Sequence, residues 1–384
     1  MNFNLSDDQT TFQQVIRDFV NSEIRPIVRE FEQQNKYPSE VVELMKGMGL
    51  FGLLIPSRYG GQEVDVVTMS IVFEEISKVW MGVAGILGSH TLACHMISQH
   101  GTEEQKLKYL PDLASGKRRT GIALTEPDAG SDVQSISTKA WRDGDDYIVR
   151  GRKMWITNAR HADPLPVLVK TNTEASPRHA GMSILLIDQQ SEGLVVSRDM
   201  GKLGYKGPET CEVLLDDVRV PSSNLLGGVE GRGMQQALSA LEVGRINIAA
   251  RAVGIASAAL SDSIDYARKR KAFGQSIGEF QAVQLRIADM ATSIEASRLL
   301  TRWAGSCIDN GQRSDSESGM AKLFASETAI TCSLDAMRIH GGMGYSTELD
   351  IERYYRDAPL MAIGEGTNDI LRTIIAKSLL KEIG

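Results

Sequence analysis

Glu365 is the carboxylate whose surroundings in the sequence most suggest chemistry. It follows the apolar run Leu360-Met361-Ala362-Ile363 and lies between Gly364 and Gly366. An unpaired charge in apolar surroundings is costly, so the pKa of such a carboxyl tends to rise toward the range that a proton-abstracting base needs. The small neighbours leave room for a substrate to approach. Most glutamates beside glycine are ordinary loop residues, so the local sequence alone does not establish a catalytic role.

The histidine spacing does not favour a metal site. His90, His95 and His100 recur every five residues, and each step turns about 500° around a helix, so the three cannot share one face. The four cysteines are far apart and form no CxxC pair: Cys94, Cys211, Cys307 and Cys332. We therefore expect no metal ion, no disulfide framework and buried free thiols.

Two further segments have residues suited to a ligand. The segment Leu124-Thr125-Glu126-Pro127-Asp128-Ala129-Gly130-Ser131-Asp132 offers hydroxyl groups and small residues where helical patterns give way to strand patterns. An ordinary turn between a helix and a strand is the alternative interpretation. The segment Lys153-Met154-Trp155-Ile156-Thr157-Asn158 places Trp155 and Thr157 two residues apart, on one face of a strand. A planar cofactor could stack there, although a β-sandwich core could also use the tryptophan.

The chain has three regions that differ in the spacing of their apolar residues, and these regions must position the candidate site residues. Residues 1–119 have apolar positions at helical spacing, and residues 69–97 hold few charges, which indicates a buried helix followed by one that lines an interior space. Residues 120–229 contain at least six short β-rich runs separated by turn residues, which predicts an antiparallel sandwich or barrel. Residues 230–384 read as long helices joined by short links, which predicts a four-helix bundle. The expected fold is thus a multi-domain α+β protein with an N-terminal helical domain, a middle β domain and a C-terminal bundle.

Composition limits the classes of partner. The 384 residues carry a formal net charge of −7, with 42% hydrophobic and 24% charged residues. The acidic balance gives no electrostatic footprint for nucleic acid or an anionic membrane, and no apolar run approaches the length of a membrane span. The segment Met1–Asp8 lacks the layout of a secretory signal or transit peptide. We therefore expect a cytoplasmic protein that binds neither nucleic acid nor membrane.

Together these segments resemble the acyl-CoA dehydrogenase family of flavoproteins, and the resemblance covers essentially the whole chain. The matching segments occur in family order: Leu124–Asp132, Lys153–Asn158, Arg270-Lys271-Ala272-Phe273-Gly274, Gln281, Gly341-Gly342-Met343-Gly344, Tyr355-Arg356-Asp357-Ala358 and Glu365-Gly366-Thr367. The helical, β, helical order derived above is also the family's layout.

The resemblance implies FAD as cofactor. Thr125 would lie near the flavin ring, Trp155 and Thr157 would pack against it, and the others would bind the phosphates, adenine or ring, some of them across a subunit interface. The implied FAD contacts are Ile122, Ala123, Leu124, Thr125, Gly130, Ser131, Trp155, Ile156, Thr157, Arg270, Phe273, Gln281, Arg338, Gly341, Gly342, Thr367 and Asp369. The implied substrate contacts are Ser131, Glu242, Arg245 and Gly366.

The resemblance also implies a reaction. Glu365 would abstract the α-proton of an acyl-CoA thioester while a β-hydride leaves to the flavin, giving a trans-2-enoyl-CoA. Some family members carry the base on the helix that holds Arg245, but the corresponding position here is Gly244. Electrons would pass to electron-transferring flavoprotein, and contacts across an interface imply at least a dimer, with a homotetramer expected. An acyl-CoA oxidase, an enoyl-CoA reductase, a flavin monooxygenase and a flavin-bearing, DNA-associated member are the alternatives on the same scaffold.

Two departures from the family pattern and one absence of charge bear on the substrate and cofactor. Gly364 stands where straight-chain enzymes often have tyrosine, which suggests a wider pocket for short, branched or cyclic acyl groups unless a neighbouring side chain compensates. Arg338 replaces a frequent glutamine and is either an added cation for the FAD pyrophosphate or a surface arginine at a helix end. Residues 80–99 contain no Arg or Lys. A buried distal carboxylate needs such a partner, so this weighs mildly against a dicarboxylic acyl group.

Overall fold

The computed structural model describes residues 4–382, so Met1–Phe3 of the N-terminal stretch and the last two residues of the predicted bundle lie outside the described residues. Helices α1 to α6 form the first region. Their bounds, with the short π and 3₁₀ turns between them, are α1 Asp7–Phe19, η1 Val20–Ile24, α2 Val28–Gln33, α3 Ser39–Gly47, η2 Leu50–Gly52, η3 Ser57–Tyr59, α4 Val66–Ser77, α5 Met81–His100 and α6 Glu103–Ala114. Helices α4 and α5 are buried almost throughout, as the scarcity of charge in residues 69–97 predicts.

The middle region is one six-stranded sheet with the order β4-β3-β1-β2-β6-β5. The strands and the short turns near them are η4 Val133–Ser135, β1 Lys139–Asp143, β2 Asp146–Thr157, β3 Leu165–Lys170, η5 Arg178–Gly181, β4 Met182–Ile187, β5 Leu194–Val196, β6 Thr210–Pro221, η6 Ser222–Asn224 and η7 Leu226–Gly228. The expected antiparallel pairing holds for four of the five neighbours, whereas β1 and β3 pair in parallel at Lys139 and Lys170. The sheet is therefore mixed.

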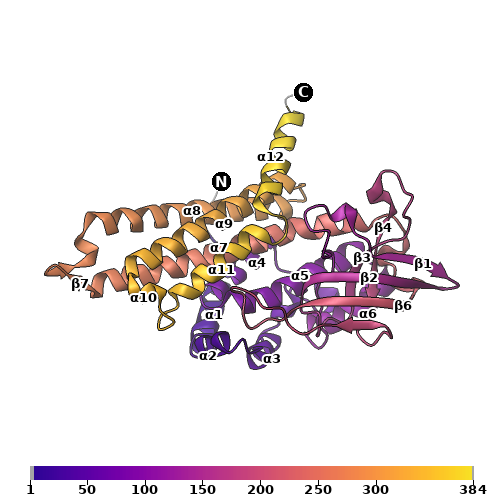
Figure 1. Ribbon diagram of the computed structural model, residues 1–384, viewed down its shortest axis with the longest axis horizontal. Helices are drawn as coiled ribbons and strands as arrows, with labels where there is room; N and C mark the ends of the chain where they lie inside the picture. The colour runs from indigo at the N-terminus through magenta and orange to yellow at the C-terminus, as the bar shows by residue number, and fades with distance from the viewer. Residues whose placement is uncertain (1–3, 383–384) are drawn as a thin grey trace.

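Long helices make up the third region. Their bounds, with the small hairpin between α7 and α8, are α7 Gly233–Lys269, β7 Lys271–Ala272, β8 Gln275–Ser276, η8 Ile277–Glu279, α8 Gln281–Asp309, α9 Asp315–His340, α10 Gly342–Tyr345, α11 Ile351–Ile363 and α12 Asn368–Glu382. Helices α7, α8, α9 and α11 lie side by side, and α12 projects from the body (Figure 1). The predicted helical bundle is confirmed.

Helix α7 runs through the centre of the molecule and contacts elements of all three regions. By length and composition it is also the one helix in residues 4–382 that could cross a membrane, but 89% of its most apolar window is buried inside the protein. It packs against α4 and α5 on one side and α8 and α9 on the other. The N-terminal helices and the C-terminal helices consequently share one hydrophobic core, which includes Phe73, Val83, Ile246 and Ala325.

Candidate active site

Glu365 lies in the short link between α11 and α12. Its φ of +55° and the φ of +94° at Gly366 turn the chain sharply. The side chain thereby points into the protein, and its Oε2 is buried without a hydrogen-bond partner. Burial raises the pKa of this carboxyl to about 7, against the opposing positive charges of Arg251, Lys322 and Arg245. A carboxyl with a pKa near neutrality is suited to accept a proton at physiological pH.

The carboxylate lies against α7 at Gly244. A Cβ built on Gly244 would lie 1.8 Å from Glu365 Oε2 and 2.9 Å from Leu92 Cδ2 of α5. Any side chain at Gly244 would therefore collide with the base. The glycine, singled out in the sequence because it lacks a side chain, is what allows Glu365 to lie between α5 and α7.

Lys322 of α9 holds the link from the other side. Its Nζ donates to the carbonyl oxygen of Gly366 at 2.8 Å and to Asn368 Oδ1 at 2.9 Å. Burial lowers the pKa of Lys322 to about 8, and the negative charge of Glu365 opposes that shift. Lys322 was not identified from the sequence, because a lone lysine in a helix usually faces solvent. Here it is fully buried and fixes the backbone that carries the base.

Arg245 and Glu242, the predicted substrate contacts on α7, lie one turn apart close to the base. Arg245 is buried, and its Nη1 donates to the Asp315 carbonyl oxygen at 3.3 Å. Its Nε is buried without a partner. Burial, and then the charge of Asp315, raise the pKa of Glu242, which accepts from the Ser314 backbone N–H at 3.2 Å. Arg245 thus retains one free donor near Glu365.

The segment Leu124–Asp132 is fixed to the sheet by a buried ion pair. Glu126 accepts from Lys153 Nζ at 2.9 Å and from the backbone N–H groups of Ser137 and Thr138. Burial acts to raise the pKa of Glu126, but these donors outweigh it and the pKa falls to about 2. Lys153 Nζ also donates to the Leu124 carbonyl oxygen at 3.0 Å. Lys153 and Glu126 therefore fix the loop on its buried side, while Gly130 and Ser131 stay exposed.

A β-bulge shapes the end of β2, where the second predicted motif lies. The register of β2 against β6 shifts between Lys153 and Ile156, and Trp155 has a φ of +63°. Lys153 and Ile156 therefore both point into the core, whereas the Trp155 indole is 52% exposed beside the Leu124–Asp132 loop. The Met154 N–H donates to the Thr125 carbonyl oxygen at 2.9 Å, which joins the loop to the strand. An indole left open beside a loop of small and hydroxyl residues fits a planar flavin.

Ala123 and Ile156 lie beneath this surface. Both side chains are buried in the core of the sheet. The Ala123 N–H donates to Pro166 and its carbonyl oxygen accepts from Leu168. The Ala123 and Ile156 side chains are therefore not exposed at the predicted FAD site, whereas Ile122, Leu124, Thr125 and Thr157 are partly exposed.

Six predicted FAD residues are not near Glu365 within one chain. They are exposed at the far end of the helical bundle, around the β7–β8 hairpin and α10 (Figure 1): Arg270, Phe273, Gln281, Arg338, Gly341 and Gly342. Phe273 is 96% exposed. Arg338 forms an ion pair with Asp335 at 3.0 Å. This separation is what contacts made across a subunit interface require.

Thr367 and Asp369, the last two predicted FAD residues, begin α12. The Thr367 hydroxyl accepts from the Ile370 N–H at 3.4 Å, as a helix N-cap does. Asp369 is exposed and pairs with Arg372. Both residues directly follow the link that carries Glu365, at the start of α12.

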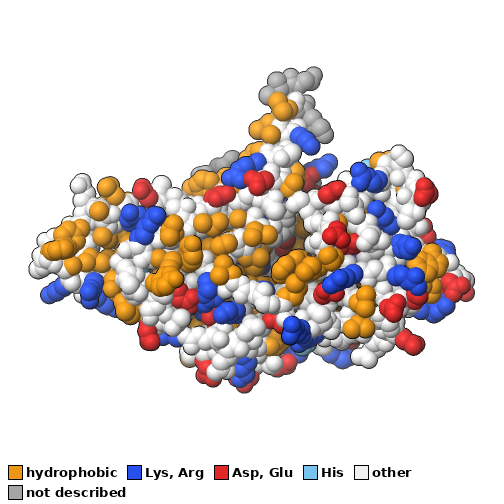
Figure 2. Space-filling view, viewed as in Figure 1, with side chains coloured by type: hydrophobic (Ala, Val, Ile, Leu, Met, Phe, Trp, Pro, Cys, Tyr) orange, Lys and Arg blue, Asp and Glu red, His pale blue; other side chains and the backbone are white. Residues whose placement is uncertain are grey.

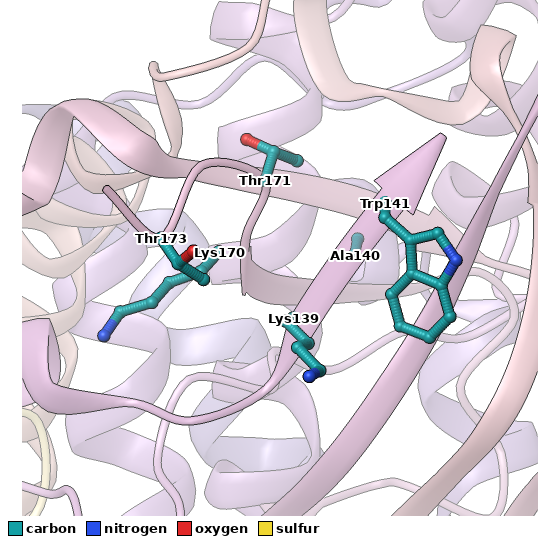
Figure 3. Close-up of a pocket in the computed structure, with 6 residues that line it drawn as sticks. All are labelled: Lys139, Ala140, Trp141, Lys170, Thr171 and Thr173. Carbon is teal, nitrogen blue, oxygen red and sulfur yellow. The ribbon is translucent and has the colours of Figure 1, made fainter. Parts of the chain in front are cut away.

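A hollow of about 280 Å³ lies beside β1 and the end of β3 (Figure 3). Lys139, Trp141, Lys170 and Thr171 line it, and the two lysine side chains point in different directions. It contains no carboxylate or histidine, so it lacks the acid–base groups that Glu365 provides.

His90 and Cys94 have structural contacts in the core. His90 is buried against the Phe51 carbonyl oxygen at 3.1 Å and Cys94 at 3.2 Å, and burial lowers its pKa to about 4. Within residues 4–382, no group of His, Cys, Asp and Glu is arranged to hold a metal ion. All four cysteines are free, and Cys307 is partly exposed whereas the other three are buried.

Comparison with known proteins identifies the family. Residues 6–117 match the acyl-CoA dehydrogenase N-terminal domain, residues 121–218 the middle domain and residues 231–380 the C-terminal domain. The chain belongs to the acyl-CoA dehydrogenase family, which comprises FAD-dependent oxidoreductases acting on CH–CH groups. The resemblance seen in the sequence is confirmed.

Relatives of known name match over almost their whole length. The probable acyl-CoA dehydrogenase YngJ of Bacillus subtilis is 41% identical over 99% of this chain and 100% of its own. The caffeyl-CoA reductase-Etf complex subunit CarC of Acetobacterium woodii is 38% identical over 98% of this chain and 99% of its own. The solved structure of butyryl-CoA dehydrogenase from Megasphaera elsdenii has a TM-score of 0.96 and 34% identity, covering 99% of this chain and 100% of that one.

Proposed function

We propose that the protein dehydrogenates an acyl-CoA thioester between Cα and Cβ, with Glu365 as the base. The α-proton passes to the Glu365 carboxylate, and the electron pair left on Cα forms the double bond as the β-hydrogen departs with its own pair. FAD, when bound, supplies the acceptor for that hydride. The observation that carries the proposal is the buried, unpartnered Oε2 of Glu365, whose pKa is raised to about 7.

The rest of the site supports this role through position and charge. Lys322 fixes the backbone of the link, and Arg245 lies beside the carboxylate with a free Nε donor. We propose that the Glu365 backbone N–H donates to the thioester oxygen as negative charge develops there. FAD would lie between Trp155 and the Leu124–Asp132 loop. A second subunit would add the exposed residues near the β7–β8 hairpin.

Gly364 supports a short, branched or cyclic acyl group. Its φ of −66° is ordinary, so the backbone does not require glycine there. A Cβ at this position would meet only the Leu360 carbonyl oxygen, at 3.5 Å. The missing side chain therefore leaves space beside the base.

We also propose electron-transferring flavoprotein as the redox partner, a homotetrameric assembly and a cytoplasmic location. The relative named as a subunit of a reductase–Etf complex supports the first. Exposed apolar side chains on α8, α9 and α12 support the second, and Figure 2 shows hydrophobic side chains gathered over the C-terminal helices. The exposed apolar residues of these helices include Leu285, Leu299, Trp303, Phe324 and Leu380.

The second candidate function is reduction of an enoyl-CoA, the same chemistry in reverse. It is favoured by the relative named caffeyl-CoA reductase. Glu365 would then return a proton to Cα. The potential at which substrate and product equilibrate with the flavin separates the two directions, and the oxygen reactivity of the reduced, product-bound flavin separates both from an oxidase.

Anaerobic titration of the purified holoenzyme with a panel of acyl-CoA thioesters tests the function, with flavin bleaching as the readout. We expect bleaching by short or branched substrates and a loss of about 10²- to 10⁴-fold in its rate in Glu365→Gln. Glu348→Gln, the same change at an exposed glutamate, serves as the control and should match the wild type. A wild-type rate in Glu365→Gln would show that another group is the base.

A further inference from the structure

Unpartnered polar atoms gather along the contact between α5 and α7, beyond Glu365. Both amide atoms of Asn247 and the Nε of Arg251 are buried without hydrogen-bond partners. Asn247 is fully buried and Arg251 is 5% exposed. Buried polar groups without partners are costly, and they are a common sign of a missing ligand.

These groups follow one another along the contact between α5 and α7, starting at Glu365. Helices α5 and α7 run antiparallel here, with Leu92 opposite Gly244 and Gly88 opposite Asn247. A Cβ at Gly88 would lie 2.4 Å from Asn247 Nδ2. One turn further along α5, a Cβ at Gly85 would lie 2.0 Å from the Tyr205 hydroxyl oxygen.

Tyr205 connects this row of residues to Arg251 and to the flavin side of the site. The Arg251 guanidinium carbon lies 5.4 Å from the centre of the Tyr205 ring. The Tyr205 hydroxyl also interacts with Thr157, a predicted flavin contact. The row therefore runs from Glu365, past Asn247, to Arg251.

Arg251 lies on the same face of α7 as Gly244. Seven residues separate them, which is nearly two full turns and about 10 Å along the axis. The charge of Arg251 acts on the Glu365 carboxyl, as the largest influence that lowers its pKa. The end of this row of residues is therefore cationic, and it is close enough to the base for one acyl group to reach both.

The guanidinium has no anionic partner of its own. Its Nη2 donates to Met81 Sδ at 2.7 Å, and it forms no ion pair with any carboxylate in the described part of the chain. Of the other two cations near the base, Arg245 pairs with Asp315, whereas Lys322 donates to the neutral oxygens of Gly366 and Asn368. A buried cation whose polar contacts are a thioether and the Tyr205 hydroxyl, with no carboxylate among them, is poised to bind an anion.

We propose that Arg251 and Asn247 bind a carboxylate at the distal end of the acyl group, so that the preferred substrate is a dicarboxylic acyl thioester. This inference rests on the proposed function, since it names the substrate class for the same site. The arginine would donate to the carboxylate oxygens and the Asn247 amide would add one donor. The spacing from Gly244 suits an acyl group of roughly five or six carbons.

The sequence weighed mildly against a dicarboxylic acyl group because residues 80–99 hold no Arg or Lys. The structure confirms that α5 contributes glycines and Leu92 to this contact, not a cation. The cation comes instead from α7, which packs against α5. The small residues of α5 are what leave room for Asn247 and Tyr205.

Matched substrate pairs test the proposal with the holoenzyme under anaerobic conditions. Adipyl-CoA is compared with hexanoyl-CoA, and glutaryl-CoA with pentanoyl-CoA, by the kcat/KM for flavin reduction. We expect the dicarboxylic member to be preferred by about tenfold or more, and Arg251→Gln to remove that preference. Arg251→Lys keeps the charge and should retain part of the preference. Arg150→Gln on the outer face of the sheet should leave it unchanged.

A second experiment measures the binding of the same four thioesters to the Glu365→Gln variant by calorimetry. This variant is not expected to turn the thioesters over. The result distinguishes failure of the proposed function from failure of the proposed substrate class. Tighter binding of the dicarboxylic members, without flavin reduction in the wild type by any thioester, would overturn the proposed function and leave this inference standing. Flavin reduction with no preference in either rate or binding would overturn the inference alone. A preference that survives in Arg251→Gln protein with wild-type FAD content would also overturn it.

Discussion

The Glu365 carboxylate fills the space that a side chain at Gly244 would need. A Cβ at Gly244 would lie 1.8 Å from Glu365 Oε2, although the two residues are 121 positions apart in the sequence. One residue comes from the link before α12 and the other from the middle helix α7. A base at either position could therefore reach the same reacting atoms, but both side chains cannot be present together.

Exchanging the two residues should move the base without removing it. Gly244→Ala alone should lower the rate of flavin reduction strongly, because it displaces the carboxylate. The double variant Gly244→Glu with Glu365→Gly should recover part of the activity that Glu365→Gly loses, since glycine suits the φ of +55° at position 365. Steady-state kinetics with FAD content as the control measures this. No recovery would show that the base must approach from the link.

The rate of flavin reduction should rise with pH as Glu365 loses its proton, with a midpoint near the pKa of about 7. Arg251 stabilises the ionised carboxylate, so Arg251→Gln should move this midpoint to higher pH. Arg150→Gln should not move it. Stopped-flow flavin reduction from pH 5 to 9 gives the midpoints, and an unmoved midpoint in Arg251→Gln would contradict the charge relationship.

The raised pKa of Glu365 also determines how the stability of the folded protein changes with pH. The folded-state pKa of Glu365 lies above the value of about 4.3 expected in the unfolded chain. The folded protein therefore holds this proton more tightly, and the contribution of Glu365 to stability falls as pH rises from about 4 through 7. In Glu365→Gln that loss should be absent, so thermal unfolding of the variant should be less sensitive to pH over this range.

The ion pair between Glu126 and Lys153 should be far more sensitive to mutation than an exposed one on the same strand. Glu126→Gln leaves the fully buried Lys153 ammonium without its counter-ion, which should cost about 3–5 kcal/mol and reduce FAD retention. Glu212→Gln removes the partly exposed partner of the exposed Arg152 and should cost about 0–1 kcal/mol. Chemical denaturation and FAD content of both variants provide the measurement. Equal losses would contradict an anchoring role for Glu126.

Arg270 should act on the active site of a neighbouring subunit. Arg270→Ala should lose FAD, whereas Arg268→Ala, at an exposed position two residues before it, should not. Mixing refolded or co-expressed Arg270→Ala and Glu365→Gln subunits should restore activity, because some sites then combine an intact Glu365 with an intact Arg270. If both residues served the same subunit's site, the mixture would stay inactive.

The arrangement of regions could be predicted from the sequence because each has its own periodicity. The first of the long helices expected in residues 230–384 spans Gly233–Lys269. Strand β1 contains no apolar run that could mark it in the sequence, because only Ala140 of its five residues is buried. Tyr147–Val149 and Met154–Thr157 read as two separate β-rich runs in the sequence. They form one strand, β2, because the polar residues between them alternate between solvent and the buried contact with Glu126.

Residues of the candidate active site could be predicted from the sequence only where they lie in a recognisable motif. Glu365 and the loop around Glu126 belong to recognisable segments, whereas Arg251 and Asn247 lie in an Ala-rich helix with no local signal. Their proximity to the base depends on the packing of α7 against α5. One pattern was available: the seven-residue spacing from Gly244 to Arg251 places both on one helix face. The parallel pairing of β1 with β3 had no such signal, since strand partners depend on tertiary contacts.

Helix α7 fixes the angle about its axis between the base at Glu365 and the distant β7–β8 hairpin. It runs without interruption from Gly233 to Lys269, so Gly244 near its start and Arg270 just past its end keep a constant angle about one axis. A single inserted residue between Arg251 and Tyr266 would turn the β7–β8 hairpin by about 100° relative to the base and displace it by about 1.5 Å. Length changes in this helix should therefore be tolerated only in whole turns, even where no residue of either site is altered.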